Sequence, residues 1–337
     1  MRDYTVGGPE AKNAEVKNLV EADWYRPTVD RETMKALMAR SNGIAARDTT
    51  IWLVLLIGSG ILAYLSWGSW WAIPAFALYG VMYGSASDAR WHECGHRTAF
   101  RSRRANDIIY HVAAFMDYRE PISWRWSHAR HHSDTIIVGR DPEIAFQRGA
   151  PLVNTFLELF AIRTIIAESK KLFLNAVGRP TREQADFQPA DEMRGSYWWS
   201  RIYLVAFGGV IVWCIAAGSI LPAMFIGLPT IYGRWLMVVY GITQHAGLAE
   251  DVLDHRLNTR TVMMNRVNRF MYLNMNYHLE HHIFPTVPYH SLPRLHAAVA
   301  DQLPTPHRSI WHAIREILPT LAKQRNDQSV VLARVLP

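Results

Sequence analysis

The residues of this chain best suited to chemistry are histidines gathered in three short clusters. They stand in His92-Glu93-Cys94-Gly95-His96, in His128-Ala129-Arg130-His131-His132 and in Asn276-Tyr277-His278-Leu279-Glu280-His281-His282. Residues three and four apart lie on one face of a helix, so each cluster would aim its imidazoles in one direction. Neutral imidazole is a common ligand of iron, copper, nickel and zinc. The spacing therefore predicts metal binding.

The number of histidines predicts two metal ions rather than one. One small ion takes about four to six donors, whereas the clusters supply eight imidazoles and His245, at the end of a hydrophobic run, offers a ninth. We therefore expect a dinuclear centre whose ligands are His92, His96, His128, His131, His132, His245, His278, His281 and His282. His255 lies ten residues beyond His245 with no cluster around it, and we expect it to be a solvated loop residue. Cys94 is expected to point away from the histidine face.

Two long runs without charge predict how these clusters are positioned. No charged residue occurs between Asp48 and Asp88, and Arg234 is the only one between Arg201 and Glu250. A helix crosses the bilayer core of ~30 Å in about twenty residues, so each run has the length of two spans. The turns at 66–71 and 218–222 carry no Lys or Arg, whereas the flanks do. This pattern places the flanks and both termini in the cytoplasm.

The sequence thus predicts an all-α integral membrane protein of one domain, with four transmembrane helices in two hairpins and a cytoplasmic helical cap that holds the clusters. The expected segments are a cytoplasmic lead-in at 1–48, a hairpin at 49–87, a cytoplasmic segment with the first two clusters at 88–196, a second hairpin at 197–245 and a cytoplasmic segment with the third cluster at 246–337.

Four further helices are expected outside the spans. The apolar stretch 151–167 contains Glu158 and Arg163, which are costly in a bilayer centre, so it is interpreted as one interfacial helix. Amphipathic helices are expected near 31–40, 292–303 and 309–321.

Polar residues near the clusters are candidates for supporting roles. A metal-bound imidazole is commonly held through its second ring nitrogen, and the residues expected to do this are Asp88, Glu93, Asp134, Asn274 and Glu280. Arg234 stands well inside the fourth expected span. It would either pair with backbone carbonyls or snorkel, or line a substrate cavity.

The overall charge indicates which kinds of binding partner to expect. The chain has 337 residues, of which 50% are hydrophobic, and a net charge of +7. Basic cytoplasmic loops, anionic lipid headgroups or an acidic protein partner all account for this charge. No basic run interleaves with aromatic residues, which argues against nucleic acid.

The three clusters and their order resemble the membrane-bound fatty acid desaturase and hydroxylase superfamily. The likeness includes the surroundings of the second and third clusters, Trp126–Thr135 and Asn276–Pro285, with two expected spans between them. It implies a non-haem di-iron centre on the cytoplasmic face, O2 as co-substrate for attack on an unactivated C–H bond, and a separate electron donor. The eight cluster histidines match the family's iron ligands, and His245 matches an additional histidine often found after the fourth span.

The chain also departs from some branches of that superfamily. Acyl-lipid desaturases often have a further histidine where this chain has Arg97, and front-end desaturases replace the residue matching His278 with glutamine and carry a fused cytochrome. The subgroup therefore stays open. The overall likeness is to bacterial members that work with ferredoxins, which implies a bacterial inner membrane.

The expected function is O2-dependent desaturation or hydroxylation of a fatty acyl or other hydrophobic or amphipathic substrate that enters from the membrane. Oxidative demethylation or hydroxylation of a smaller metabolite is the alternative. The sequence contains no haem domain, iron–sulfur cysteine set or Gly-rich dinucleotide fingerprint. Electrons are therefore expected from a ferredoxin or cytochrome through its reductase.

Two other functional classes fit less of the sequence. The first cluster also matches H-E-x-x-H of zinc metalloproteases, but a catalytic zinc uses three protein ligands and would leave the other histidines without a role. An ion transporter would place its ligands within the spans, whereas these clusters lie beyond the span ends.

Overall fold

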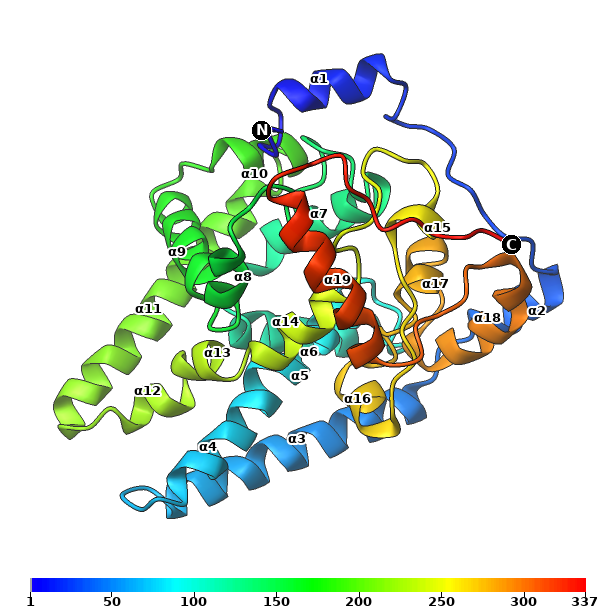
Figure 1. Cartoon of the computed structure of the whole chain (residues 1–337). Coiled ribbons are helices and arrows are strands. Elements are labelled where there is room, and N and C mark those ends of the chain that lie inside the picture. The colour runs from blue at the N-terminus through cyan, green and yellow to red at the C-terminus, as the bar shows by residue number, and fades with distance from the viewer. Residues whose placement is uncertain (1) are drawn as a thin grey trace.

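The computed structural model describes residues 2–337, and the regular structure of these residues is helical (Figure 1). Extended pairing is limited there to two isolated bridges, Thr261 with Tyr277 and Val262 with His307. The all-α class is confirmed. In chain order the helices are α1 Pro9–Val16, α2 Arg31–Leu37, α3 Asn42–Leu65, α4 Ala72–Gly80, η1 Val81–Ser85, α5 Ala86–Gly95, α6 Arg103–Met116, α7 Pro121–Ser133, α8 Leu152–Glu158, α9 Ile162–Ala176, α10 Arg182–Phe187, α11 Met193–Ala217, α12 Leu221–Phe225, α13 Leu228–Tyr232, α14 Trp235–Ile242, α15 His255–Asn258, α16 Arg266–Met271, α17 His278–Ile283, η2 Tyr289–Ser291, α18 Leu292–Val299, η3 Ala300–Gln302 and α19 Ile310–Gln324.

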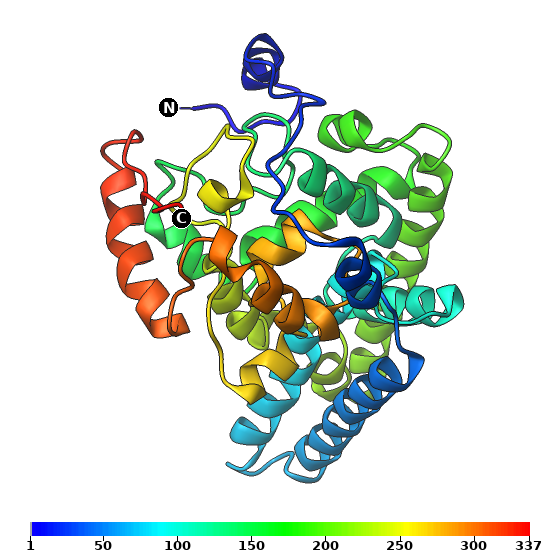
Figure 2. The same cartoon turned by 90° about the vertical axis from the view of Figure 1, so that its right-hand side faces the viewer.

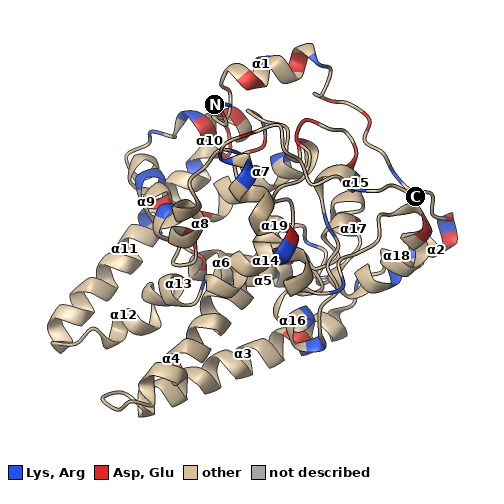
Figure 3. Cartoon of the chain, in the orientation of Figure 1, with Lys and Arg blue, Asp and Glu red and all other residues tan. Residues whose placement is uncertain are grey.

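Two pairs of helical elements project from the body of the molecule toward the same side. The turn between α3 and α4 and the turn between α11 and α12 form the far ends, while both chain termini lie on the opposite side (Figure 1). Figure 2 shows α3 and α4 projecting together from the body. The projecting ends carry no Lys, Arg, Asp or Glu, whereas the body carries many (Figure 3). This division separates an apolar layer from a charged one.

Two helical stretches are long and apolar enough to cross a membrane, Arg31–Leu65 and Met193–Ala217. Large apolar side chains on them face outward, and Val54 and Val205 are 63% and 76% exposed. Such exposure is unfavourable in water, and lipid tails would cover it. The structure therefore supports two spans. The arrangement of four spans in two hairpins stays a prediction.

The second and fourth expected spans have irregular helical structure. α4, η1 and α5 follow one another from Ala72 to Gly95, with η1 a π-helical turn. The stretch expected as the fourth span is instead three short helices, α12, α13 and α14. Pro222 and Pro229 each stand in a helix's first turn, where proline's fixed φ and missing N–H are tolerated, and Gly227 has a φ of +95°. A single continuous helix over this stretch was the wrong expectation.

The broken stretch packs closely on the π-helical turn. A Cβ on Gly233 would lie 1.8 Å from the Gly80 carbonyl oxygen, and one on Gly84 would lie 2.6 Å from that of Pro229. The Ser85 hydroxyl donates to the Gly233 carbonyl at 2.6 Å. These contacts fix the junction of α13 and α14 beside the helix that ends in the first histidine cluster.

The interfacial segment at 151–167 is two helices rather than one. α8 ends at Glu158 and α9 begins at Ile162, because Ala161 between them adopts a left-handed φ of 52°. Val153 and Phe156 on α8 are exposed. Helices are confirmed at α2, α18 with η3, and α19, in the three places where amphipathic helices were expected.

The three clusters lie in the charged body, on α5, α7 and α17. The core around them is rich in aromatic residues. Trp91 packs against Tyr110 of α6, with the ring centroids 6.1 Å apart, and against Trp124 of α7 at 5.8 Å. Because these rings join α5, α6 and α7, the first two clusters are held by one packed unit.

Candidate metal centre

The nine histidines expected as ligands gather in two adjoining groups. The first group contains His92, His96, His128, His132 and His281, and the second contains His131, His245, His278 and His282. Within each group one nitrogen from every ring lies within 4.8 Å of all the others. His245 takes its place in the second group although it lies outside the three clusters.

The ring nitrogens approach one another at the spacing of neighbouring metal ligands. In the first group, the Nε2 atoms of His92 and His281 are 2.8 Å apart, and those of His96 and His128 are 3.0 Å apart. In the second, Nε2 of His278 lies 3.1 Å from Nε2 of both His245 and His282. Two imidazole nitrogens about 2.0–2.1 Å from one ion and at right angles to each other are about 3 Å apart. Each group is therefore spaced to surround one ion.

Most of these rings favour the neutral form, which does not oppose a cation. Burial lowers the pKa of seven of these imidazoles well below its ordinary value, and neighbouring histidines lower the pKa further; the seven are His92, His96, His132, His245, His278, His281 and His282. Neutral imidazoles packed nitrogen to nitrogen leave lone pairs without enough protons between them. A metal ion in each group would use these lone pairs.

Four imidazoles are oriented through their outer ring nitrogen. Nδ1 of His131 lies 2.9 Å from an Asp141 carboxylate oxygen, and Nδ1 of His128 lies 3.1 Å from one of Glu143. Nδ1 of His282 lies 3.1 Å from the Thr135 hydroxyl, and Nδ1 of His245 lies 2.8 Å from the Asn258 carbonyl oxygen. With these contacts on Nδ1, Nε2 is free to face the group's centre.

Asp141 also acts on the protonation of His131. Burial opposes ionisation of this imidazole, but the Asp141 carboxylate raises its pKa overall. A carboxylate on the outer nitrogen makes the ring a better electron donor to a metal at the other nitrogen.

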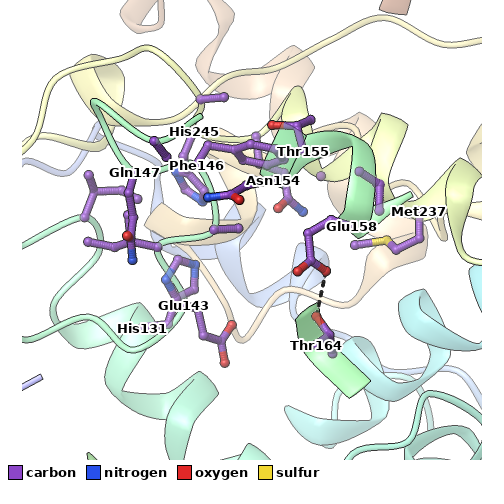
Figure 4. Close-up of a pocket in the computed structure, with 18 of the residues that line it drawn as sticks. His131, Glu143, Phe146, Gln147, Asn154, Thr155, Glu158, Thr164, Met237 and His245 are labelled. Atoms are coloured by element: carbon purple, nitrogen blue, oxygen red, sulfur yellow. Dashed lines mark hydrogen bonds between the residues drawn. The ribbon is translucent and has the colours of Figure 1, made fainter. Parts of the chain in front are cut away.

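A cavity of about 380 Å³ opens onto both histidine groups. His92 and His128 of the first group line it, as do His131, His245 and His278 of the second. In Figure 4, His131 and His245 lie on one side of this space, and Glu158 and Met237 lie on the other. Arg234 lines the same cavity. A molecule in this cavity would lie against any metal held by the histidines.

Comparisons with known proteins fit this arrangement. The sequence model of the fatty acid desaturase family matches residues 67–314, which include all nine histidines. The chain belongs to the fatty acid desaturase family. It is therefore an oxidoreductase of a membrane-bound family of lipid metabolism.

Several plant desaturases are similar to this family member over most of its length. An acyl-lipid (9+3)-(E)-desaturase of Dimorphotheca sinuata is 24% identical over 292 residues, which cover 76% of this chain and 74% of the relative. A Delta(12)-oleate desaturase of Trichosanthes kirilowii is 24% identical over 290 residues, covering 75% and 76%. A Delta(12) acyl-lipid conjugase of Impatiens balsamina is 26% identical over 256 residues, covering 68% and 64%.

The five polar residues expected to support the imidazoles of this desaturase family member have other partners. An Asp88 carboxylate oxygen accepts from Arg119 at 2.5 Å, and one of Asp134 accepts from Arg140 at 3.1 Å. Glu93 accepts from the Tyr289 backbone N–H, Asn274 donates to the Tyr289 carbonyl, and Glu280 contacts Thr261 and His296. Within residues 2–337, the hydrogen bonds of these five do not reach a cluster histidine.

The contacts of Glu93 bear on the zinc protease alternative. Its carboxylate is buried, one oxygen accepts from the backbone N–H of Tyr289, and Glu93 belongs to neither histidine group. Burial raises the pKa of Glu93 to about 7. A metalloprotease needs the Glu of H-E-x-x-H beside the metal as a general base, so this geometry does not fit that chemistry. Cys94 belongs to neither histidine group.

The expectation that His255 is a solvated loop residue was wrong. Its side chain is 3% exposed, and its ring stacks on Trp24 with the centroids 4.2 Å apart. The same ring lies 5.3 Å from that of His282. The N-terminal segment around Trp24 covers this histidine, which is a contact between residues far apart in the sequence.

Proposed function

We propose that this protein is a membrane-bound di-iron oxidoreductase that uses O2 and external electrons to desaturate or hydroxylate an unactivated C–H bond of a lipid-like substrate. The observation that carries the proposal is the division of nine histidines into groups of five and four, each spaced to surround one ion. Membership of the fatty acid desaturase family favours iron over other metals that imidazole binds. Iron bound in both groups would supply the redox chemistry that amino-acid side chains lack.

The protein's own residues would hold and orient the metal-binding rings. Asp141, Glu143 and Thr135 contact outer ring nitrogens at 2.9–3.1 Å, so their imidazoles are fixed before any metal binds. Most of these rings are almost entirely buried, and His281 is fully so. Burial limits the access of water to the reacting carbon, which favours oxidation of the substrate over side reactions.

The membrane arrangement is proposed as one domain with four spans in two hairpins, both termini and the metal centre being cytoplasmic. The two long apolar helices and the charge-free projecting ends support this arrangement. The segment α12–α14 would complete the second hairpin despite its breaks, because packing of glycine on glycine against η1 shields its backbone from lipid.

A separate protein is proposed as the electron donor, either a ferredoxin or a cytochrome served by its reductase. The charged body lies on the side of the molecule opposite the projecting ends (Figure 3), and the chain carries a net charge of +7. An acidic carrier would be attracted to such a surface.

The proposed function is tested by metal analysis together with turnover. Purified protein should hold two irons per chain, and product formation should consume O2 and reducing equivalents. Mass spectrometry of lipids from cells with and without the gene should then reveal the altered substrate. An active preparation with stoichiometric zinc in place of iron would refute the proposal.

A further inference from the structure

Arg234 differs from the other charged residues that line the cavity. Its side chain is 8% exposed, and its Nε and Nη1 atoms are buried with no hydrogen-bond partner among residues 2–337. A buried guanidinium without partners is unfavourable by several kcal/mol at least, because it has lost its water and gained nothing in exchange. An anionic ligand would stabilise such a group.

The nearby acids are already engaged or neutralised. Asp88 pairs with Arg119 at 2.5 Å, and the Arg119 guanidinium also lies over the rings of Trp91 and Trp124. Burial raises the pKa of Asp117 and the neighbouring Asp88 carboxylate raises it further, although Arg119 and Arg234 lower it, and one Asp117 oxygen accepts from the Ser87 hydroxyl at 2.8 Å.

Glu158 is the remaining acid in the wall near Arg234. It accepts a hydrogen bond from Thr164 at 2.8 Å, and Figure 4 shows its carboxylate turned toward that residue. It attracts Arg234 through space without bonding to it. The positive charge of Arg234 is therefore left available on the cavity side.

The backbone of Arg234 is held rigidly. A Cβ on Gly84 would lie 3.3 Å from the Arg234 nitrogen, and the Ser85 hydroxyl bonds to the carbonyl of Gly233 just before it. Gly84 and Ser85 belong to η1, which continues through α5 to His92. The element that packs on the Arg234 backbone therefore also carries the first histidine cluster. A preorganised cation at a fixed place is the arrangement that binds an anion at small entropic cost.

We propose that Arg234 binds an oxyanion of the substrate, most simply the carboxylate of a free amphipathic acid. This inference rests on the proposed function, since it names the substrate class of the same site. The planar guanidinium matches a carboxylate or phosphate, and such charge-assisted pairs are strong when buried.

The cavity's size and polarity set where such a substrate would be oxidised. Arg234 and five of the histidines line one space of about 380 Å³, at the lower end for small-molecule sites. The oxyanion and the carbon that is oxidised would thus both lie in this one space. A free acid would place its charge against the Arg234 guanidinium, whereas an ester has no charge to offer there.

A second cavity shows what an apolar site in this protein looks like. It has a volume of about 610 Å³ and is lined almost entirely by aromatic and aliphatic side chains, including Tyr83, Phe115 and Tyr203. None of the nine histidines lines it. Lipid chains would suit that cavity.

The test compares ligands that differ only in the anionic group. Iron-loaded, detergent-solubilised protein is titrated with straight-chain carboxylates of increasing length, with their methyl esters and with phosphatidylcholine vesicles, and binding is followed calorimetrically. We expect the best carboxylate to bind at least about tenfold more tightly than its ester, which is the minimum for one charge-assisted hydrogen bond. Arg234→Gln should abolish this preference while leaving ester binding unchanged, and Arg234→Lys should retain part of it.

The matched control is Arg104→Gln, an exposed arginine on α6 that does not line the cavity. It should keep the preference. Equal binding of acid and ester by the wild type, or an unchanged preference in Arg234→Gln with two irons retained, would overturn the inference. Binding and conversion of the vesicle lipid alone would identify a phospholipid substrate and also overturn the free-acid assignment. Absence of iron in the wild type would instead refute the proposed function, so the two failures are distinguishable.

Discussion

Asp141→Asn is the sharpest test of how the protein prepares the metal centre. One carboxylate oxygen of Asp141 contacts Nδ1 of His131 at 2.9 Å and accepts from the Ile136 backbone N–H at 2.8 Å. The other accepts from the Glu143 backbone N–H at 2.8 Å. An asparagine has only one acceptor oxygen. Its amide NH2 group must therefore face either the Glu143 backbone N–H or the His131 ring.

The size of the effect follows from these contacts. Loss of an outer contact to a metal-bound imidazole lowers metal affinity about 10- to 100-fold, or about 1.4 to 2.7 kcal/mol. We expect the upper end for Asp141→Asn, because the carboxylate is 2% exposed and also positions Glu143, which holds His128 of the other group. The iron affinity is measured by competition with a chelator, and the iron content by elemental analysis.

Asp134→Asn is the matched control. Asp134 is the acid nearest the second cluster in sequence and is 4% exposed, but its carboxylate pairs with Arg130 and Arg140 and not with a histidine. The Asp134→Asn variant should lose some thermal stability, and its iron affinity should stay within about twofold of the wild-type value. An equal loss of affinity in both variants, or none in Asp141→Asn, would refute the reasoning.

Three further outcomes are expected. His245→Ala removes one of four donors from the second group and should lower the iron content from two to about one per chain, with loss of turnover. The variant His312→Ala, at an exposed position, should keep both irons and its turnover. Two irons retained in His245→Ala would exclude His245 as a ligand. In metal-free protein, the unfolded chain gains protons at its histidines as the pH falls through about 6.5, while burial lowers the pKa of native rings such as His281. Stability should therefore fall below that pH, by up to about 1.4 kcal/mol per pH unit for each such histidine, and a thermal midpoint unchanged between about pH 7 and pH 5 would contradict this. Turnover with an acidic carrier should decline as salt rises, because screening weakens the attraction between exposed charges, and turnover with NADH alone would show that no separate carrier is needed.

The gathering of the nine histidines could be predicted because their spacing is a local property. His92 with His96, His128 with His132, and His278 with His282 are each four residues apart, and each pair enters one group as helical geometry requires. The division of the nine histidines into groups of five and four could not be predicted directly from their spacing. His131 and His281 leave the other histidines of their own clusters and join the opposite group, because neighbouring positions on a helix point about 100° apart.

The supporting residues were missed because they depend on loop conformation and long-range contacts. The expected acids were chosen for their nearness in sequence, whereas Asp141 and Glu143 reach the imidazoles from the loop after α7. That loop turns back through Ile136, whose φ is 56°, a conformation that its residue type does not predict. The sequence did offer one signal, a pair of acids shortly after the second cluster.

The irregular fourth segment connects the fold to the choice of substrate. A regular span would satisfy all of its backbone groups, and an unpaired charge within it would be costly. The break at Gly233 instead lets this stretch pack backbone to backbone on Gly80 and on Gly84 of the π-helical turn, and π-helical turns are frequent at functional sites. The same packing carries Arg234 into the wall of the cavity that reaches the histidines. The irregular helices therefore leave a cation in the wall of the cavity that the histidines share, and this favours a substrate with an anionic group.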